Sequence, residues 1–343
     1  MLFHFCNIYI FHIETTRKSN KIIITKGASR PFFYMNRFMG NKPFNPYSGY
    51  IRSEFGSRVQ KISIDAGFTC PNRDGTKSTG GCVYCDNKTF SQEYCNSEKS
   101  ITDQLNQGIA FFRDKYKTQK YIAYFQAYSN TYAPPEKLQA LYEEALSHPR
   151  VTGLAIGTRP DCIDDDTLAC IRGFSRKHHT VIEYGVESFD NNVLQNINRC
   201  HTFQDAIYAV EKTAEYGIMC GIHLLFGLPG EKEGYIGKTA KTVSQLPVKF
   251  LKTHQLQIIR GTKMEAWYRK NPELFRFYTV DEYIDLIISF LERLNPEIVI
   301  ERFISESPPE KICNPRWGIK NHEFVNKLTN RMQKKSTWQG KNY

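Results

Sequence analysis

The sequence predicts an α/β fold built around a parallel sheet. From residue 60 onward, short runs rich in β-branched and aromatic residues alternate about six times with longer amphipathic segments. The strand candidates are 61–66, 121–127, 153–157, 181–186, 221–226 and 253–259, with a seventh at 299–303. Such alternation indicates right-handed crossovers between parallel strands, which a doubly wound sheet and a full or partial (β/α) barrel both satisfy. Either fold places its chemistry at the carboxyl ends of the strands.

Three of the intervening segments show apolar residues at helical spacing. Their faces are Ile101, Leu105, Ile109, Phe112 and Tyr116 in the first, Leu138, Leu141, Tyr142, Ala145 and Leu146 in the second, and Ile284, Ile287, Ile288, Leu291 and Leu294 in the third. Pro296 ends the third segment.

Composition and charge narrow the class of protein. The chain has 343 residues, of which 41% are apolar, so it can bury a large core and is not globally disordered. Its formal charge of +11 comes from the two ends, because residues 1–61 carry +8 and residues 311–343 carry +7. Basic ends around a slightly acidic centre indicate a polyanionic partner such as nucleic acid, or simply solubilising tails. The candidate contacts are Arg52, Arg58, Lys61, Lys320, Lys327 and Arg331.

The chain divides into three parts. Residues 1–47 are expected to be an N-terminal extension, disordered or upstream of the true start, 48–310 the catalytic core, and 311–343 a basic extension packed on or near it. Residues 1–13 are apolar but too short to span a bilayer, and they lack a basic segment before them. Ten cysteines in a long, core-rich chain are typical of reduced thiols. We therefore expect a cytoplasmic protein with no membrane partner.

The sequence CPNRDGTKSTGGCVYC, residues 70–85, follows the first predicted strand. Three glycines at 75, 80 and 81 allow this loop to fold back, so that Cys70, Cys82 and Cys85 converge. Three thiolates can hold three irons of a cubane cluster and leave the fourth iron open. A zinc site remains an alternative, with Cys95 as a fourth ligand, and it would make the chain a non-catalytic binding module.

The cysteine loop resembles that of radical S-adenosylmethionine (SAM) enzymes, and its long first gap is similar to the branch related to the elongator catalytic subunit. Further segments resemble the bacterial YhcC/YtqA-type radical SAM family between residues 48 and 340. They are FQAYSNTY (125–132), GTRPDC (157–162), EYGVES (183–188), INRCH (197–201), GIHLLFGLPGE (221–231), VIERF (299–303) and WQG (338–340). The resemblance implies a partial (β/α)6 TIM-barrel core with N- and C-terminal extensions.

The same resemblance implies the cofactors, which are a [4Fe–4S] cluster and SAM. Cys70, Cys82 and Cys85 would hold the cluster, and Tyr84 would lie near the adenine. In the wider superfamily a Gly-Gly-Glu element after the second strand binds the methionine amine. This chain instead offers the polar side chains of Gln126, Ser129 and Asn130.

Charged residues on later strands complete the predicted site. Glu183 and Glu187 share strand parity and should face the interior, where ribose hydroxyls, the methionine ammonium or Arg159 would pair with them. Arg159 ends the third strand and could bind the methionine carboxylate. His223 and Cys162 are the candidate catalytic residues.

The resemblance favours a tRNA substrate, with modification of the C5 side chain of a wobble uridine by a 5′-deoxyadenosyl radical. A small-molecule substrate is the alternative. A flavodoxin or ferredoxin would deliver the electron, and the oligomeric state is not predicted.

Overall fold

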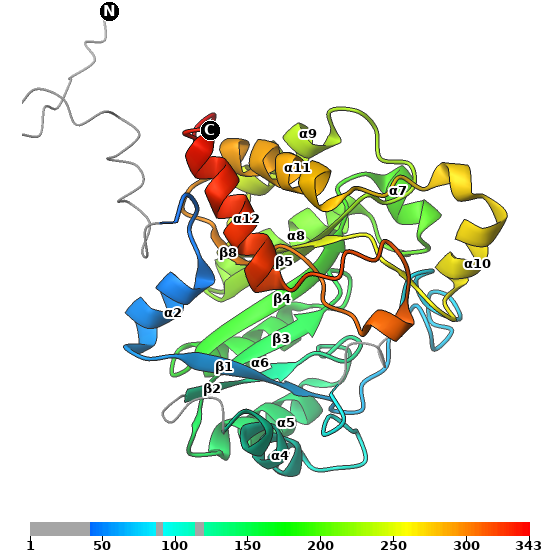
Figure 1. Cartoon of the computed structure of the whole chain (residues 1–343). Coiled ribbons are helices and arrows are strands. Elements are labelled where there is room, and N and C mark those ends of the chain that lie inside the picture. The colour runs from blue at the N-terminus through cyan, green and yellow to red at the C-terminus, as the bar shows by residue number, and fades with distance from the viewer. Residues whose placement is uncertain (1–41, 87–91, 114–119) are drawn as a thin grey trace, which may run out of the picture.

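The computed structural model describes residues 42–86, 92–113 and 120–343, and its sheet contains seven parallel strands (Figure 1). The strand order is β1-β2-β3-β4-β5-β6-β8, so the strands of this sheet lie side by side in the order in which they follow along the chain. The strands are β1 (Val59–Ile64), β2 (Lys120–Phe125), β3 (Val151–Thr158), β4 (His179–Glu187), β5 (Met219–Phe226), β6 (Phe250–Gln255) and β8 (Val299–Arg302). The expectation of a parallel α/β sheet is confirmed, and the seventh candidate is part of it.

Helices connect the strands and cover the outer face of the sheet with the largest apolar core. The connecting helices in this core are α4 (Ile101–Arg113), α5 (Pro135–Ser147), α6 (Asp165–Ser175), α8 (Phe203–Glu215), α9 (Tyr235–Gln245) and α11 (Val280–Arg293). Two others, α7 (Asn191–Asn196) and α10 (Lys263–Lys270), belong to a second apolar cluster, against which Val83 and Tyr84 pack. The three predicted apolar faces lie on α4, α5 and α11, although Tyr116 falls outside the described residues. Thr202 and Thr279 begin α8 and α11 with capping boxes, which fixes where these helices start.

The sheet curls into a partial barrel. Lys61 of β1 and Glu301 of β8 belong to the two edge strands, yet Lys61 Nζ lies 2.7 Å from Glu301 Oε1. A flat sheet of seven strands spaced by about 4.8 Å would hold these edges far apart. The concave inner face therefore encloses the side chains that point away from the covering helices.

The amino ends of the strands are closed by α2 (Tyr47–Phe55) and the residues before it. Phe44 is buried against Phe303, and Pro46 pairs with Ile300 of β8. Residues 42–47, which fall within the expected N-terminal extension, thus pack against the barrel. Residues 1–41 of that extension lie outside the described residues.

The C-terminal segment packs on the barrel as β9 (Ile312–Asn314) and α12 (Asn321–Lys334). Its last residues return to the N-terminal side, since Gln339 N donates to Pro43 O and Gln339 Oε1 accepts from Asn45 N. The tail is thus bonded to the segment before α2.

One predicted strand, 253–259, is wrong in extent. β6 ends at Gln255, and β7 (Ile258–Ile259) leaves the sheet to pair antiparallel with β9. The break occurs where Leu256 N donates to Phe226 O at the end of β5. No helix in the described ranges combines the length and apolarity needed to cross a membrane.

Candidate active site

A cavity of about 270 Å³ opens at the carboxyl ends of the strands. Its lining comes from the cysteine loop, from the ends of β2 to β6 and from β8. Figure 1 shows this loop at the opposite end of the sheet from α2. The cavity therefore lies where parallel α/β folds carry their chemistry.

The cysteine loop brings Cys70, Cys82 and Cys85 to this one cavity. Gly75, Gly80 and Gly81 all adopt positive φ angles, as the predicted fold-back requires. Further bonds hold the loop down, since Val83 N donates to Ile197 O and Asn198 Nδ2 donates to Gly81 O. All three cysteines are free thiols, and burial together with neighbouring Cys82 raises the pKa of Cys85 to about 11.

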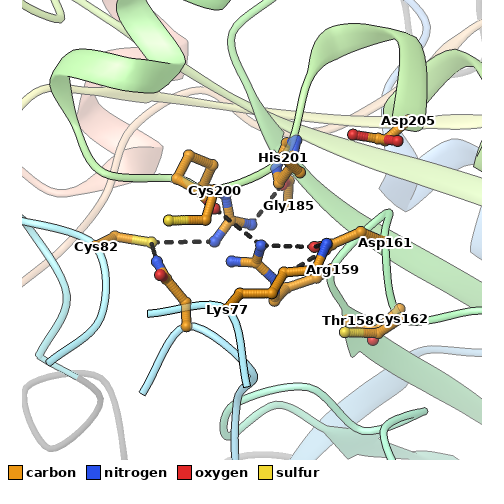
Figure 2. Close-up of polar contacts among 12 residues, drawn as sticks. Lys77, Cys82, Thr158, Arg159, Asp161, Cys162, Gly185, Cys200, His201 and Asp205 are labelled. Atoms are coloured by element: carbon orange, nitrogen blue, oxygen red, sulfur yellow. Dashed lines mark hydrogen bonds and ion pairs between the residues drawn. The ribbon is translucent and has the colours of Figure 1, made fainter. Parts of the chain in front are cut away.

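Cys82 is the most buried of the three and accepts two hydrogen bonds (Figure 2). Arg199 Nη1 and Asn72 Nδ2 both lie 3.4 Å from its sulfur. Arg199 Nη2 also donates to Gly185 O at 2.5 Å and lies 3.8 Å from Glu187 Oε1. A buried cation next to a sulfur favours the thiolate that metal binding needs.

The predicted SAM-binding residues that follow β2 differ in whether their side chains line the cavity. Gln126 and Ser129 line the cavity, and Ser129 Oγ has no hydrogen-bond partner although it is buried. Asn130 does not line it: its Nδ2 donates to the carbonyls of Phe125 and Gly157, which fastens the end of β2 to β3. The Nδ2 group of Asn130 is therefore used by the fold, its buried Oδ1 has no hydrogen-bond partner, and its role in cofactor binding stays a prediction.

Arg159 lines the cavity and is held from behind (Figure 2). Its Nε and Nη2 each lie 2.9 Å from the carboxylate of Asp161, and Nη2 also donates to Arg199 O. Burial opposes ionisation of Asp161, but its hydrogen bonds from Arg159 lower the pKa of this carboxyl to about 2. Arg159 Nη1 is buried without a partner, so this oriented guanidinium keeps one donor for a ligand.

Glu183 lies in a charged cluster on the inner face of the sheet. Lys61 Nζ and Lys252 Nζ each approach it to 2.5 Å, and His223 Nε2 lies 3.1 Å away. Although burial acts in the other direction, Lys252 and Lys61 hold the pKa of Glu183 well below its ordinary value. Its partners are thus lysines and not Arg159, and its carboxylate is already neutralised. We call Lys61, Glu183, Lys252 and Glu301 the floor network.

A β-bulge, and not strand parity, explains why Glu187 lines the cavity. The pairing of β4 with β5 shifts register between Gly185 and Glu187, and Glu187 has a φ angle of 65°. This bulge turns the side chain towards Arg199, with which it forms a long ion pair. Glu187 is therefore less neutralised than Glu183.

The two candidate catalytic residues are separated by the fold. His223 lines the cavity and donates to Glu183, while burial, followed by Lys252, lowers its pKa. Cys162 lies outside the cavity lining, and burial raises the pKa of its thiol to about 12. The radical-site role expected for Cys162 stays a prediction.

The basic residues predicted for nucleic acid fall into different environments. Lys61 is corrected, since it belongs to the floor network and its side chain is only 16% exposed. Arg331 is engaged by Asp281 and Asp285. Lys320 and Lys327 are exposed on and beside α12, whereas Arg52 and Arg58 are exposed near α2.

Several residues of the cavity and of the floor network were not predicted from the sequence: Arg73, Arg199, His254, Gln255, Gln257 and Arg302 line the cavity, and Lys252 and Glu301 belong to the floor network. Four of them stand in segments already noted for their resemblance, CPNRDG, INRCH and VIERF, without a role. Lys252 and His254 alternate within β6, and polar residues of equal parity in a buried strand are a signal for an enclosed polar site.

The residues around the cysteines fit an anionic iron–sulfur cofactor. Three thiols share the cavity with Arg73 and Arg199, each of which has a buried Nε without a partner. Among the described residues no three His, Cys, Asp or Glu side chains are already gathered as a metal-ligand set. The thiols thus share a cavity with unpaired cationic donors, which suits thiolates and a negatively charged cluster.

Two sequence models match successive parts of the chain. That of the radical SAM superfamily matches residues 72–243, and that of the Radical_SAM C-terminal domain matches residues 248–334. The chain belongs to the radical SAM superfamily. Membership implies SAM and a [4Fe–4S] cluster as cofactors.

Individual relatives agree with this family. The chain is 32% identical to YtqA of Bacillus subtilis over 313 residues, covering 91% of this chain and 96% of YtqA. It is 28% identical over 204 residues to a tRNA uridine(34) acetyltransferase of Methanocaldococcus infernus, covering 58% of this chain and only 36% of that protein. The resemblance to YtqA-type proteins is confirmed.

The fold has a solved counterpart in the archaeal Elp3 of Methanocaldococcus infernus. The TM-score is 0.62 at 18% identity, covering 82% of this chain and 64% of the Elp3 chain. This likeness confirms the partial-barrel fold.

Proposed function

We propose that this protein is a radical SAM enzyme that holds its cluster through Cys70, Cys82 and Cys85 and binds SAM in the adjoining cavity. The observation that carries the proposal is that these three thiols line one cavity together with unpartnered buried donors at the carboxyl ends of the strands. When bound, the cluster supplies the electron that splits SAM into methionine and a 5′-deoxyadenosyl radical. A flavodoxin or ferredoxin would serve as reductant.

The chain's own residues would orient SAM. Arg159, fixed by Asp161, offers Nη1 to the methionine carboxylate. Glu187, only loosely paired with Arg199, offers a carboxylate to the ammonium or the ribose hydroxyls. Ser129 Oγ and Gln126 would provide further polar contacts, and Tyr84 would pack near the adenine. Glu183 is omitted because its lysine partners already neutralise it.

Anaerobic reconstitution with iron and sulfide tests this proposal. We expect a brown protein that releases 5′-deoxyadenosine from SAM under reduction, and Cys82→Ala should lose both properties. Cys170→Ala is the matched control, since this half-buried thiol lies on α6 away from the cavity. A colourless protein that binds zinc through the same cysteines would overturn the proposal.

For the substrate we propose tRNA, with reaction at the C5 side chain of a wobble uridine. The support is the similarity to a tRNA uridine(34) acetyltransferase and the Elp3-like fold. Lys320 adds to this support, because it precedes α12 near the carboxyl end of β8, where Phe303 N donates to Asn321 Oδ1. An exposed lysine on the cavity side could contact phosphate while a base enters the cavity.

Nucleoside mass spectrometry of tRNA from a deletion strain tests this substrate. We expect a wobble-uridine modification to disappear and to return when the wild-type gene, but not a Cys82→Ala gene, is supplied. Unchanged nucleosides would favour a small-molecule substrate. That alternative draws support from the short overlap with the acetyltransferase and from Lys61 and Arg331 being used in ion pairs.

A further inference from the structure

Arg302 on the wall of the cavity has no role in the function proposed above. It ends β8 within the VIERF segment, in register with Lys252 of the neighbouring strand β6. Its side chain lines the same cavity as the cysteines, together with His254, Gln255 and Ser305. The preceding residue, Glu301, belongs to the floor network, so the two charged residues of this segment serve different purposes.

The positive charge of Arg302 is not matched by the described residues. No carboxylate among them forms an ion pair with Arg302, because Glu301 binds Lys61 and Lys252, and Glu183 binds the same lysines and His223. A half-buried cation without a counter-charge is costly, so a partner is expected to complete it.

The hydrogen bonding of His254 shows which kind of partner is missing. Arg302 Nη2 lies 3.2 Å from His254 Nε2 and can only donate, so Nε2 accepts and the ring proton stands on Nδ1. Burial, reinforced by Arg302, holds the pKa of His254 well below its ordinary value, which keeps the ring neutral. His254 Nδ1 and Arg302 Nε are both buried without a partner. Two unpaired donors and one unmatched positive charge call for an anionic acceptor.

We propose that Arg302 and His254 form an oxyanion subsite that binds the carboxylate of a small acid as a second substrate in the cavity. One unmatched positive charge balances a monoanionic carboxylate, whereas a phosphate monoester would bring up to two negative charges. The subsite shares its cavity with the proposed radical reaction and deepens that function, but binding at Arg302 does not require the reaction to occur.

Ligand-observed fluorine NMR of the reconstituted full-length protein tests the subsite, with trifluoroacetate as the probe and trifluoroacetamide as its neutral isostere. We expect the fluorine signal of trifluoroacetate, and not that of trifluoroacetamide, to broaden in a saturable way. Added acetate should reverse this broadening. Arg302→Gln should weaken binding about tenfold or more, because a charge-assisted hydrogen bond is lost, and Arg302→Lys should retain part of it. Arg276→Gln is the control, since this arginine is exposed outside the cavity.

The outcomes separate the subsite from the proposed function. Equal binding by wild type and Arg302→Gln, or displacement by phosphate and not by acetate, would overturn the subsite. Release of 5′-deoxyadenosine is measured on the same samples. If release is absent while Arg302-dependent binding persists, the radical function fails and the subsite stands. If 5′-deoxyadenosine is released without Arg302-dependent binding, the subsite fails and the radical function stands.

Discussion

The inner face of the partial barrel carries two groups of charged residues that differ in how completely they are neutralised. In the floor network, two lysines and two glutamates from β1, β4, β6 and β8 bind one another within 3.2 Å. Around the cysteines, Arg73, Arg159 and Arg199 face sulfur, carbonyl groups and one well-placed carboxylate, and each keeps a buried nitrogen without a partner. The charges of the floor network neutralise one another, whereas the arginines around the cysteines keep donors for a ligand.

This difference teaches which charges hold the fold and which serve the chemistry. A buried charge that is fully paired contributes to structure and has little left to offer a substrate. A buried donor that has no partner within the protein indicates a place where a bound molecule supplies the acceptor. Arg302 belongs with the second group although it lies beside the first in sequence.

Removing one member of the floor network should have the largest effect on stability. Glu183→Ala leaves Lys61 and Lys252 buried with one carboxylate, that of Glu301, in place of two, and we expect a loss of about 3–5 kcal/mol in the free energy of unfolding. Chemical denaturation followed by circular dichroism measures this loss. Asp285→Ala, which removes exposed ion pairs with Arg331 and Lys335, should change the midpoint little. Similar midpoints for the two variants would show that the floor is not a structural unit.

Displacing Arg199 should disturb the surroundings of Cys82 without unfolding the protein. A Cβ added at Gly185 would lie 2.6 Å from Arg199 Nη2 and 3.0 Å from Glu187 Oε1, so Gly185→Ala must shift the Arg199 side chain, which binds Cys82, and crowds Glu187. We expect release of 5′-deoxyadenosine to fall about tenfold, as for other partners of metal ligands. Gly173→Ala is the control, because nothing lies within 4 Å of the added Cβ. Normal release by Gly185→Ala would mean that Arg199 does not position Cys82.

Two carboxylates should give opposite dependences of stability on pH. The pKa of Glu183 is depressed by its lysines, so its contribution is present above the ordinary value of 4.5 and is lost as the pH falls below it. Burial raises the pKa of Glu231 to about 7, so the folded state holds an extra proton and stability declines as the pH rises from 4.5 to about 7.

Glu231→Gln isolates the second effect. The unfolding free energy of this variant, measured by denaturation between pH 4.5 and 7, should fall less steeply with pH than that of the wild type. The glutamate accepts one backbone N–H from Gly227 and one from Leu228 on its two oxygens, and Gln keeps an acceptor for one of them. An identical slope in both proteins would contradict the assignment.

The smallest expected effect concerns the surface. The double substitution Lys320→Gln and Lys327→Gln should make the plot of log binding constant against log salt concentration less steep by about two, because two phosphate contacts are lost. Fluorescence anisotropy with labelled tRNA across salt concentrations measures it. The pair Arg52→Gln and Arg58→Gln serves as the control, since α2 closes the end of the sheet opposite the cavity. A larger effect from the α2 pair would move the RNA surface to that end.

The site could be predicted wherever local sequence decides where a residue lies. Cys70, Cys82 and Cys85 follow the first strand with glycines that allow the loop to close, and Arg159 precedes a proline at a strand end. Gln126, Ser129, Glu183, Glu187 and His223 also line the cavity. Asn130 and Cys162 also follow strands but do not line the cavity, and the Asn130 amide instead donates to the backbone carbonyls of Phe125 and Gly157.

The sequence by itself determined the strand and helix order, the parallel sheet and the cysteine loop, because periodicity, glycine placement and motif spacing are local properties. Only the tertiary structure decided which charges are neutralised. Curling brings Lys61 of the first strand to Glu301 of the last, 240 positions apart, and so removes Lys61 from the surface. The bulge at Glu187 and the unmatched charge of Arg302 also depend on neighbours from other strands, and no single segment encodes them.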